Sequence, residues 1–146
     1  MNLSLETSRK IVSAYQAVCK PFCRETGLSQ TAFDILMFLG NNPTYKTASE
    51  IVEIRHLKAN LVSVNVDRLV RDGYLTRQAV KGDRRKTELL CTEKAQPLIA
   101  QGRQIQNAFF ERLFAGMTPD VRSAFSAAMG TMEKNLDEIL EGEAKL

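Results

Sequence analysis

The sequence contains no tryptophan, one histidine and three cysteines among its 146 residues. One histidine and three scattered cysteines do not provide the spacing of a zinc finger, and an odd cysteine count argues against a disulfide framework. The sequence also shows no glycine-rich phosphate loop, no cluster of metal ligands and no histidine placed beside a nucleophile. We therefore expect no cofactor, no metal and no enzymatic activity.

Long apolar runs are missing as well. No run approaches the roughly 20 residues that a membrane-spanning helix requires, and the opening segment MNLSLETSRK lacks the apolar core of a secretory signal. Apolar residues at 44% and charged residues at 25% are typical of a globular rather than a disordered chain. We expect a soluble, cytoplasmic protein without a membrane partner, folded as a single domain over residues 1–146.

The net charge of +3 is distributed unevenly along the chain. Residues 55–92 contain nine Lys or Arg and four Asp or Glu, a balance of +5, whereas the remaining residues have a balance of −2. Binding to a polyanion such as DNA requires a local concentration of positive charge of this kind. A solvated basic face is the alternative interpretation.

Apolar residues recur at the helical period of 3.6 in the first part of the chain. This period predicts a helix from Leu5 to about Arg24. Ser29 is a suitable N-cap for a second helix that ends near Gly40. Its buried residues are expected to be Phe33, Leu36, Met37 and Leu39.

A short helix, a tight turn and a longer helix follow. The sequence TASE at residues 47–50 is a capping box that opens a helix ending near Glu53. A turn at Arg55 and His56 leads into a helix over residues 57–72. The residues of this helix expected to face inward are Leu57, Leu61, Val62, Val66 and Leu69. This order of elements is the helix-turn-helix pattern.

Two β-type runs, Tyr74–Val80 and Lys86–Cys91, then flank a turn at Gly82 and Asp83. The second half of this turn is cationic and consists of Arg84, Arg85 and Lys86. In a winged helix-turn-helix, the longer helix lies in the major groove of DNA and a basic β-ribbon reaches the backbone and adjacent minor groove. We therefore predict a DNA-binding regulator in which these three cations contact DNA.

Long helices are expected after the ribbon. Thr92 can cap a helix that runs to about Phe114, with a bend or a late start caused by Pro97. The sequence TPD at residues 118–120 combines a cap, a proline at the first helical position and an acid, which together start a further helix. The predicted fold class is mainly α (α+β), with a winged helix-turn-helix lobe over residues 28–95.

The flanking helices carry more apolar surface than one chain can bury. Four apolar residues surround the end of the helix after the ribbon: Phe109, Phe110, Leu113 and Phe114. We predict that residues 1–27 and 96–146 are dimerisation helices that pack on a second copy and present two reading helices to a palindromic site. Burial of these residues in one monomeric core is the alternative.

Three segments make the chain similar to the MarR family of bacterial regulators (multiple-antibiotic-resistance regulators). They are VDRL at residues 66–69, DGYL at residues 72–75 and GDRR at residues 82–85, closing at Thr92. The similarity covers nearly the whole chain. It implies a homodimer, acting as a repressor, that binds a short inverted repeat. It also implies that the wing arginines enter the minor groove, with Asp83 orienting Arg84 or Arg85.

The outward residues of the recognition helix are the expected DNA contacts. On helical geometry they are Lys58, Ala59, Asn60, Ser63 and Val64. Asn60 can pair with an adenine, and Val64, where the family commonly has an arginine or another polar residue, suggests contact with thymine methyl groups. Arg68 either contacts phosphate or is tied to Asp67 or Asp72.

Two more positions depart from the family pattern. Asn65 falls on the inner face of the recognition helix, where an apolar residue is usual, so it either bonds neighbouring backbone or lines a ligand cavity. Cys91 replaces the usual leucine and fits the core as a small apolar residue.

The resemblance also motivates a small aromatic or lipophilic effector that releases the DNA. Its expected cleft lies between the dimer helices and the DNA-binding lobe. The candidate lining residues are Tyr15, Phe22, Phe33, Met37, His56 and Asn65.

Two alternatives to an effector-released repressor concern other chemistry. Cys19 and Cys23 share a helical face near Lys20 and Arg24, which suggests a thiol-based redox sensor. The simpler interpretation is that Cys19 is buried beside its apolar neighbours. A winged helix that binds another protein is the remaining alternative.

Overall fold

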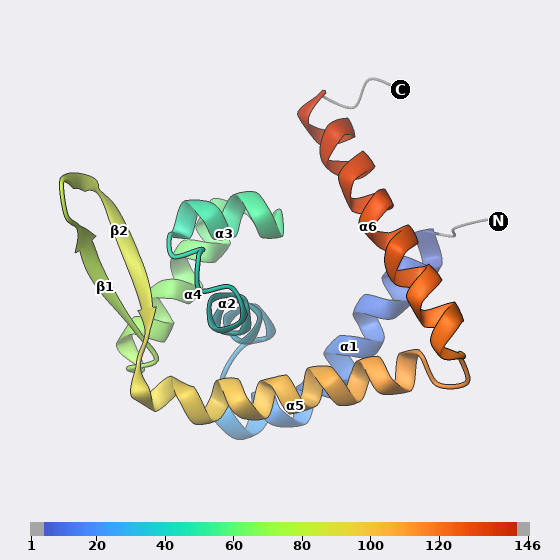
Figure 1. The fold of residues 1–146 in the computed structure, drawn as a ribbon. Coiled ribbons are helices and arrows are strands. Elements are labelled where there is room, and N and C mark those ends of the chain that lie inside the picture. Colours follow the sequence, from blue (N-terminus) through green and yellow to red (C-terminus); the bar gives the residue numbers. More distant parts are fainter. Residues whose placement is uncertain (1–4, 143–146) are drawn as a thin grey trace. The chain divides into compact units, whose positions relative to one another are not determined.

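The computed structural model describes residues 5–142, which are mainly helical with one two-stranded antiparallel sheet (Figure 1). The elements are α1 Leu5–Thr26, α2 Gln30–Asn41, α3 Ala48–Arg55, α4 Ala59–Arg71, β1 Leu75–Val80, β2 Asp83–Cys91, the 3-10 helix η1 Glu93–Ala95, α5 Gln96–Leu113 and α6 Pro119–Glu141. The chain divides into two compact units after Phe109. The predicted winged helix-turn-helix fold is confirmed. Within residues 5–142, no helix combines the length and the apolar character needed to cross a membrane.

Three helices begin at the caps that the sequence predicts. Ser29 Oγ accepts a hydrogen bond from the Ala32 amide at 3.0 Å and caps α2. Thr47 and Glu50 form the reciprocal capping box of α3, with N···O distances of 3.2 and 3.1 Å. Thr118 caps α6 in the same way. Each cap satisfies backbone N–H groups that the first turn of a helix leaves without partners.

The predicted cap of α5 is wrong in one respect. The Thr92 hydroxyl donates to the Gly73 carbonyl at 2.6 Å instead of accepting from the helix, and η1 comes between. Thr92 is therefore occupied in closing the base of the hairpin. The late start expected from Pro97 is confirmed, because α5 begins at Gln96 and leaves the proline in its first turn, where no amide is needed.

Helix α2 forms the centre of the first unit and is buried on nearly all sides. All four of its residues predicted to be buried are buried, and Ile35 and Phe38 are buried as well. The helix contacts α1, α4 and β2. A helix that is apolar on every side lies inside the core, so α2 supports the elements that build the functional surface.

Helices α2 and α5 approach each other closely at two glycines. A Cβ added to Gly102 would come within 3.0 Å of the Phe33 ring and closer still to the Met37 sulfur, and one added to Gly40 would lie 2.9 Å from the Ile99 side chain. The two helices are therefore packed at a distance that leaves no room for a methyl group at either position.

The second unit contains the end of α5 and the whole of α6. Phe114 packs edge-to-face on Phe125 with ring centroids 5.5 Å apart, and Arg122 pairs with Glu111 at 3.4 Å. No described residue of α6 is buried. Its exposed large apolar residues are Val121, Phe125, Met129, Leu136, Ile139 and Leu140.

Candidate nucleic-acid interface

The helix-turn-helix is formed by α3 and α4. His56 ends α3 in the left-handed conformation, with φ 52° and ψ 40°, so the chain reverses direction before α4 begins. Val62, Val66 and Leu69 of α4 are buried in the core together with Ile51 of α3. This packing leaves the opposite side of α4 open to solvent.

The residues of α4 and its N-cap predicted to contact DNA all lie on the exposed side: Lys58, Ala59, Asn60, Ser63 and Val64. Val64 is 67% exposed. One prediction for the inner face is wrong, because Leu61 is 40% exposed. The buried stripe is centred on Val62 and Val66, and Leu61 lies at its edge in the open first turn of the helix.

Asn65 is buried with 7% of its surface exposed, and both groups of its amide have partners. Its Nδ2 donates to the Leu61 carbonyl at 2.8 Å, which confirms the predicted bond to neighbouring backbone. Its Oδ1 accepts from the Ser29 hydroxyl, also at 2.8 Å. The amide therefore joins the recognition helix to the N-terminus of α2.

The wing is the β1–β2 hairpin, and it contains a register shift at its basic end. Gly82 turns the chain with φ 91°. The pairing passes from Ala79 opposite Thr87 directly to Val80 opposite Asp83, so residues 84–86 lie outside the paired ladder. An insertion of this kind bends a strand and re-aims its side chains.

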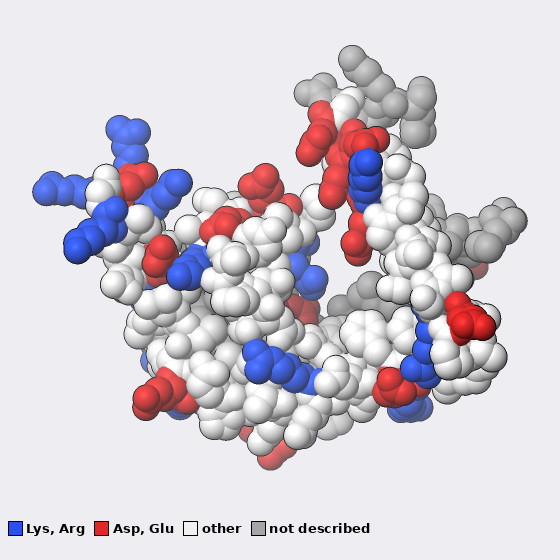
Figure 2. Space-filling model, in the orientation of Figure 1, with Lys and Arg blue, Asp and Glu red and all other residues white. Residues whose placement is uncertain are grey.

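The three cations predicted in the turn, Arg84, Arg85 and Lys86, are therefore placed in the irregular part of β2, which begins at Asp83. All three are exposed. Figure 2 shows Lys and Arg side chains gathered around the tip of the hairpin. The wing consequently carries its charge at the end that extends from the core.

Asp83 contacts Arg85 through the main chain. Its Oδ1 accepts from the Arg85 amide at 3.0 Å, a local bond typical of an aspartate two residues earlier in a turn. No ion pair within residues 5–142 joins Asp83 to the guanidinium of Arg84 or Arg85. Asp83 shapes the backbone of the wing and leaves both guanidinium groups free of this carboxylate.

The cations of the wing differ in what they face. Arg85 and Lys86 line a polar pocket of about 580 Å³ together with the N-terminal turn of α3, including Glu50 and Glu53, and Arg84 is not among its lining residues. The Glu50 pKa is lowered, first by the hydrogen bond from the Lys46 amide and to a smaller extent by the charge of Lys86. Arg84 is therefore the wing arginine without acidic neighbours in this pocket.

A second pocket, of about 340 Å³, lies between α3, α4 and the wing. Ala59 and Ser63 line it from α4, whereas Asn60 and Val64 do not. Arg77 of β1 lines the same pocket and pairs with Asp67 of α4, a contact that local sequence patterns did not predict because it depends on the placement of the strand. The side of α4 that faces the wing is thus distinct from its outward side.

Arg68 follows the alternative in which it is tied at the surface. Its Nε lies 3.8 Å from the Asp72 carboxylate, and its guanidinium donates to the Gly27 carbonyl at 3.4 Å. Exposed pairs of this kind are weak, on the order of 0.5 kcal/mol, so phosphate can compete for the same guanidinium.

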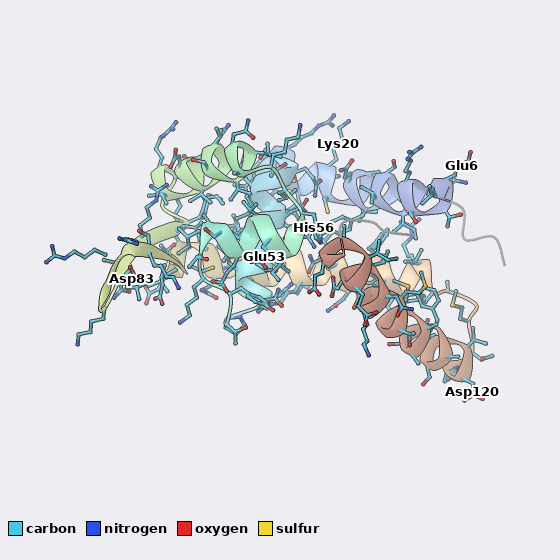
Figure 3. All side chains as sticks on the ribbon, turned by 90° about the horizontal axis from the view of Figure 1, so that it is seen from above. Glu6, Lys20, Glu53, His56, Asp83 and Asp120 are labelled. Atoms are coloured by element: carbon cyan, nitrogen blue, oxygen red, sulfur yellow. The ribbon has the colours of Figure 1, made fainter. Side chains whose placement is uncertain are left out.

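The six candidate effector residues are not gathered around one cavity. Phe22, Phe33 and Met37 fill the core, and Asn65 is bonded to Ser29. Tyr15 is half-buried, and its hydroxyl accepts from Gln106 at 3.0 Å. His56 is exposed at the end of α3, near Glu53 and away from Asp83 of the wing (Figure 3). The apolar candidates were selected by their type, and the core has taken them.

The cysteines do not have the properties of redox sensors. Cys19 is fully buried, and burial raises its pKa and the pKa of Cys23. A reactive thiol needs exposure and a lowered pKa, so the redox prediction is wrong for this structure and the core interpretation of Cys19 is confirmed. Cys91 is half-buried against the core, and burial raises its pKa also. The described residues contain no group of three His, Cys, Asp or Glu side chains that could hold a metal ion.

A helix-turn-helix followed by a β-hairpin with a basic tip defines a winged helix-turn-helix protein. Residues 26–86 match the model of the MarR family, and the chain is a MarR-family transcriptional regulator rather than an enzyme.

Solved structures share the fold over almost the full length. A MarR-family regulator of Listeria monocytogenes in complex with a 26-mer DNA is 17% identical, with a TM-score of 0.86, and the match covers 100% of this chain and 99% of that one. A MarR regulator of Methanosarcina mazei Go1 is 19% identical, with a TM-score of 0.79 and coverage of 92% and 89%. A MarR-family regulator of Silicibacter pomeroyi is 23% identical, with a TM-score of 0.74 and coverage of 88% and 86%.

Proposed function

We propose that this protein is a homodimeric repressor that binds a palindromic DNA operator and is released by a small aromatic or lipophilic effector. The carrying observation is the register shift in β2, which places Arg84, Arg85 and Lys86 outside the ladder at the exposed tip of the wing. Cations presented in this way can neutralise phosphates and enter a narrow minor groove.

The second support is the relation of the wing to the recognition helix. The Asp67–Arg77 ion pair joins α4 to β1, and Thr92 closes the base of the hairpin on Gly73. Helix and wing are therefore held side by side, as simultaneous contact with a major groove and a flanking minor groove requires. The Listeria neighbour with the same fold was solved with DNA, which agrees with this proposal.

The dimer rests on the surfaces that one copy leaves uncovered. All large apolar residues of α6 are at least partly exposed, and α1 exposes Leu5, Ile11 and Val12. An uncovered apolar stripe of this length is unusual on a monomer and favours pairing with an identical copy.

The test of DNA binding uses duplexes selected from a random library and fluorescence anisotropy over a range of salt concentrations. We expect the affinity to fall steeply with salt. Substituting Arg84→Ala and Arg85→Ala together removes four cations per dimer and is expected to reduce the magnitude of the log–log slope by about 3. Lys20→Ala with Arg24→Ala, which removes the same charge from an exposed part of α1, is the matched control.

The outcomes separate the parts of the proposal. A wild-type binding curve for the wing variant would refute the wing assignment, and a protein that binds no duplex would refute the proposed function. For the effector, a thermal-shift screen of aromatic acids and lipophilic compounds should identify a ligand that also weakens DNA binding. The pocket of about 340 Å³ between α3, α4 and the wing is within the size range of small-molecule sites. A screen without such a ligand removes effector release from the proposal.

A further inference from the structure

The recognition helix presents an uncharged surface over its first two turns. Residues 59–66 include no Asp, Glu, Lys or Arg. Val64 is 67% exposed and Leu61 is 40% exposed, and the two are three residues apart, so they are neighbours on the helix surface. An apolar pair therefore lies where a DNA-reading helix would meet the base edges.

The charged groups next to this pair are occupied elsewhere. Asp67, the first charged residue after it, pairs with Arg77 of β1. Arg68 pairs with Asp72. Ala59 and Ser63 line the pocket on the side of the wing. The outward surface that remains in the first two turns is formed by Asn60, Leu61 and Val64.

Asn60 is itself partly engaged within the helix. Its Oδ1 accepts from the Leu61 amide at 2.9 Å and satisfies one of the free donors of the first turn. The Nδ2 group is then available to donate to an acceptor on a base, such as thymine O4 or a purine N7. The reading surface thus combines one donor with two apolar side chains.

We infer that α4 recognises A·T base pairs through the 5-methyl group of a thymine, which Val64 contacts and Leu61 flanks. This inference rests on the proposed DNA-binding function. Thymine is the unmodified base that shows a methyl group in the major groove. A valine that covers the amino group of cytosine or the acceptors of guanine would leave buried polar groups without partners, which is unfavourable.

A DNA occupant is favoured over a protein partner by the charge around the surface. The wing carries Arg84, Arg85 and Lys86 outside its ladder, and Lys58 lies at the N-cap of α4. This combination separates two roles: the cations supply affinity for any duplex, and the neutral helix supplies the choice of sequence.

The experiment replaces each thymine of a selected operator by deoxyuridine, which lacks only the 5-methyl group. Symmetric replacement in both half-sites keeps the palindrome intact. At one thymine position per half-site we expect the affinity of the wild-type protein to fall about fourfold for each methyl removed, as expected for exposing one buried methyl group. Replacing that thymine pair by 5-methylcytosine·guanine should retain more affinity than replacing it by cytosine·guanine.

The variants Val64→Ala and Ser63→Ala form a matched pair, because both residues are exposed and adjacent on α4. Val64→Ala should bind the thymine and deoxyuridine operators equally, with an unchanged salt slope. Ser63→Ala should keep the wild-type preference for thymine. Salt-dependent binding without a deoxyuridine-sensitive position would overturn this inference and leave the proposed function standing. The absence of duplex binding would overturn both.

Discussion

Asn65 is the one buried polar side chain among the described residues, and its position decides its energetic role. The Ser29 hydroxyl donates to Asn65 and at the same time accepts from the Ala32 amide as the cap of α2. Two elements therefore depend on one hydroxyl group. A buried amide that loses its partner is costly, whereas replacing both partners by apolar groups can be nearly neutral.

We predict that Ser29→Ala lowers the free energy of unfolding by about 2–3 kcal/mol, because it removes a helix cap and leaves the Asn65 oxygen without a donor. Asn65→Leu added to it should cost less than the sum of the two single variants. Urea unfolding at a fixed protein concentration measures all three. Ser63→Ala, at an exposed position, should change the value by less than about 0.5 kcal/mol. Strict additivity would contradict the proposed coupling.

The thiols lead to a prediction about alkaline pH. Burial raises the pKa of Cys19 and of Cys23, so the folded protein keeps protons that the unfolded chain releases above about pH 8.5. Their contribution to stability is complete below that pH and is lost as the pH rises. We expect the free energy of unfolding to decrease between pH 8 and pH 10. The double variant Cys19→Ala, Cys23→Ala should show a shallower decrease, and equal slopes would show that these thiols do not titrate differently on unfolding.

At the scale of elements, the crossing of α2 and α5 is set by the absence of side chains at Gly40 and Gly102. Alanine is normally better than glycine inside a helix by about 1 kcal/mol. At Gly102 the added methyl group would meet Met37 and the ring of Phe33, and the Phe33 side chain is fully packed in the core. Overpacking of this kind costs about 1–3 kcal/mol, so it outweighs the gain in helix propensity.

We therefore predict that Gly102→Ala destabilises the protein by about 1 kcal/mol or more, despite its better helix propensity. Thermal or urea unfolding measures the effect. Gln101→Ala, its exposed neighbour on α5, serves as the control and should be close to neutral. A more stable Gly102→Ala protein would mean that α2 and α5 can separate at little cost.

Local signals in the sequence predicted the helix starts well. The caps at Ser29, Thr47 and Thr118 depend on residues two or three positions apart, and all three form as expected. Thr92 has the same local signal, but the chain had already brought the Gly73 carbonyl within its reach. A cap can therefore be predicted only where no distant group competes for the same hydroxyl.

The functional surface depended more on distant contacts. The helix-turn-helix and the basic tip could be predicted because they follow from spacing and charge. The register shift at residues 84–86 and the Arg77–Asp67 pair depend on how β1 and β2 align. Leu61 matched the helical period, yet the core covers only the stripe around Val62 and Val66. Periodicity gives the apolar side of a helix, and packing decides how wide its buried part is.

At the scale of the whole molecule, the uncovered surface of α6 is the feature that one copy does not explain. Its large apolar residues follow one side of the helix from Val121 to Leu140, and no described residue of α6 is buried. Two recognition helices in a two-fold dimer can read both halves of a palindrome. Dimerisation and high-affinity operator binding should therefore be lost together.

We predict that Leu136→Glu with Ile139→Glu converts the protein from a dimer to a monomer, because two carboxylates would have to be buried in the interface. Sedimentation velocity measures the mass, and anisotropy measures operator affinity, which should fall to that of a single half-site. Ser123→Glu with Ala127→Glu places the same charge roughly on the opposite side of α6 and should remain dimeric. If Leu136→Glu with Ile139→Glu stayed dimeric, the interface would lie elsewhere, and a monomeric wild type would refute the homodimer itself.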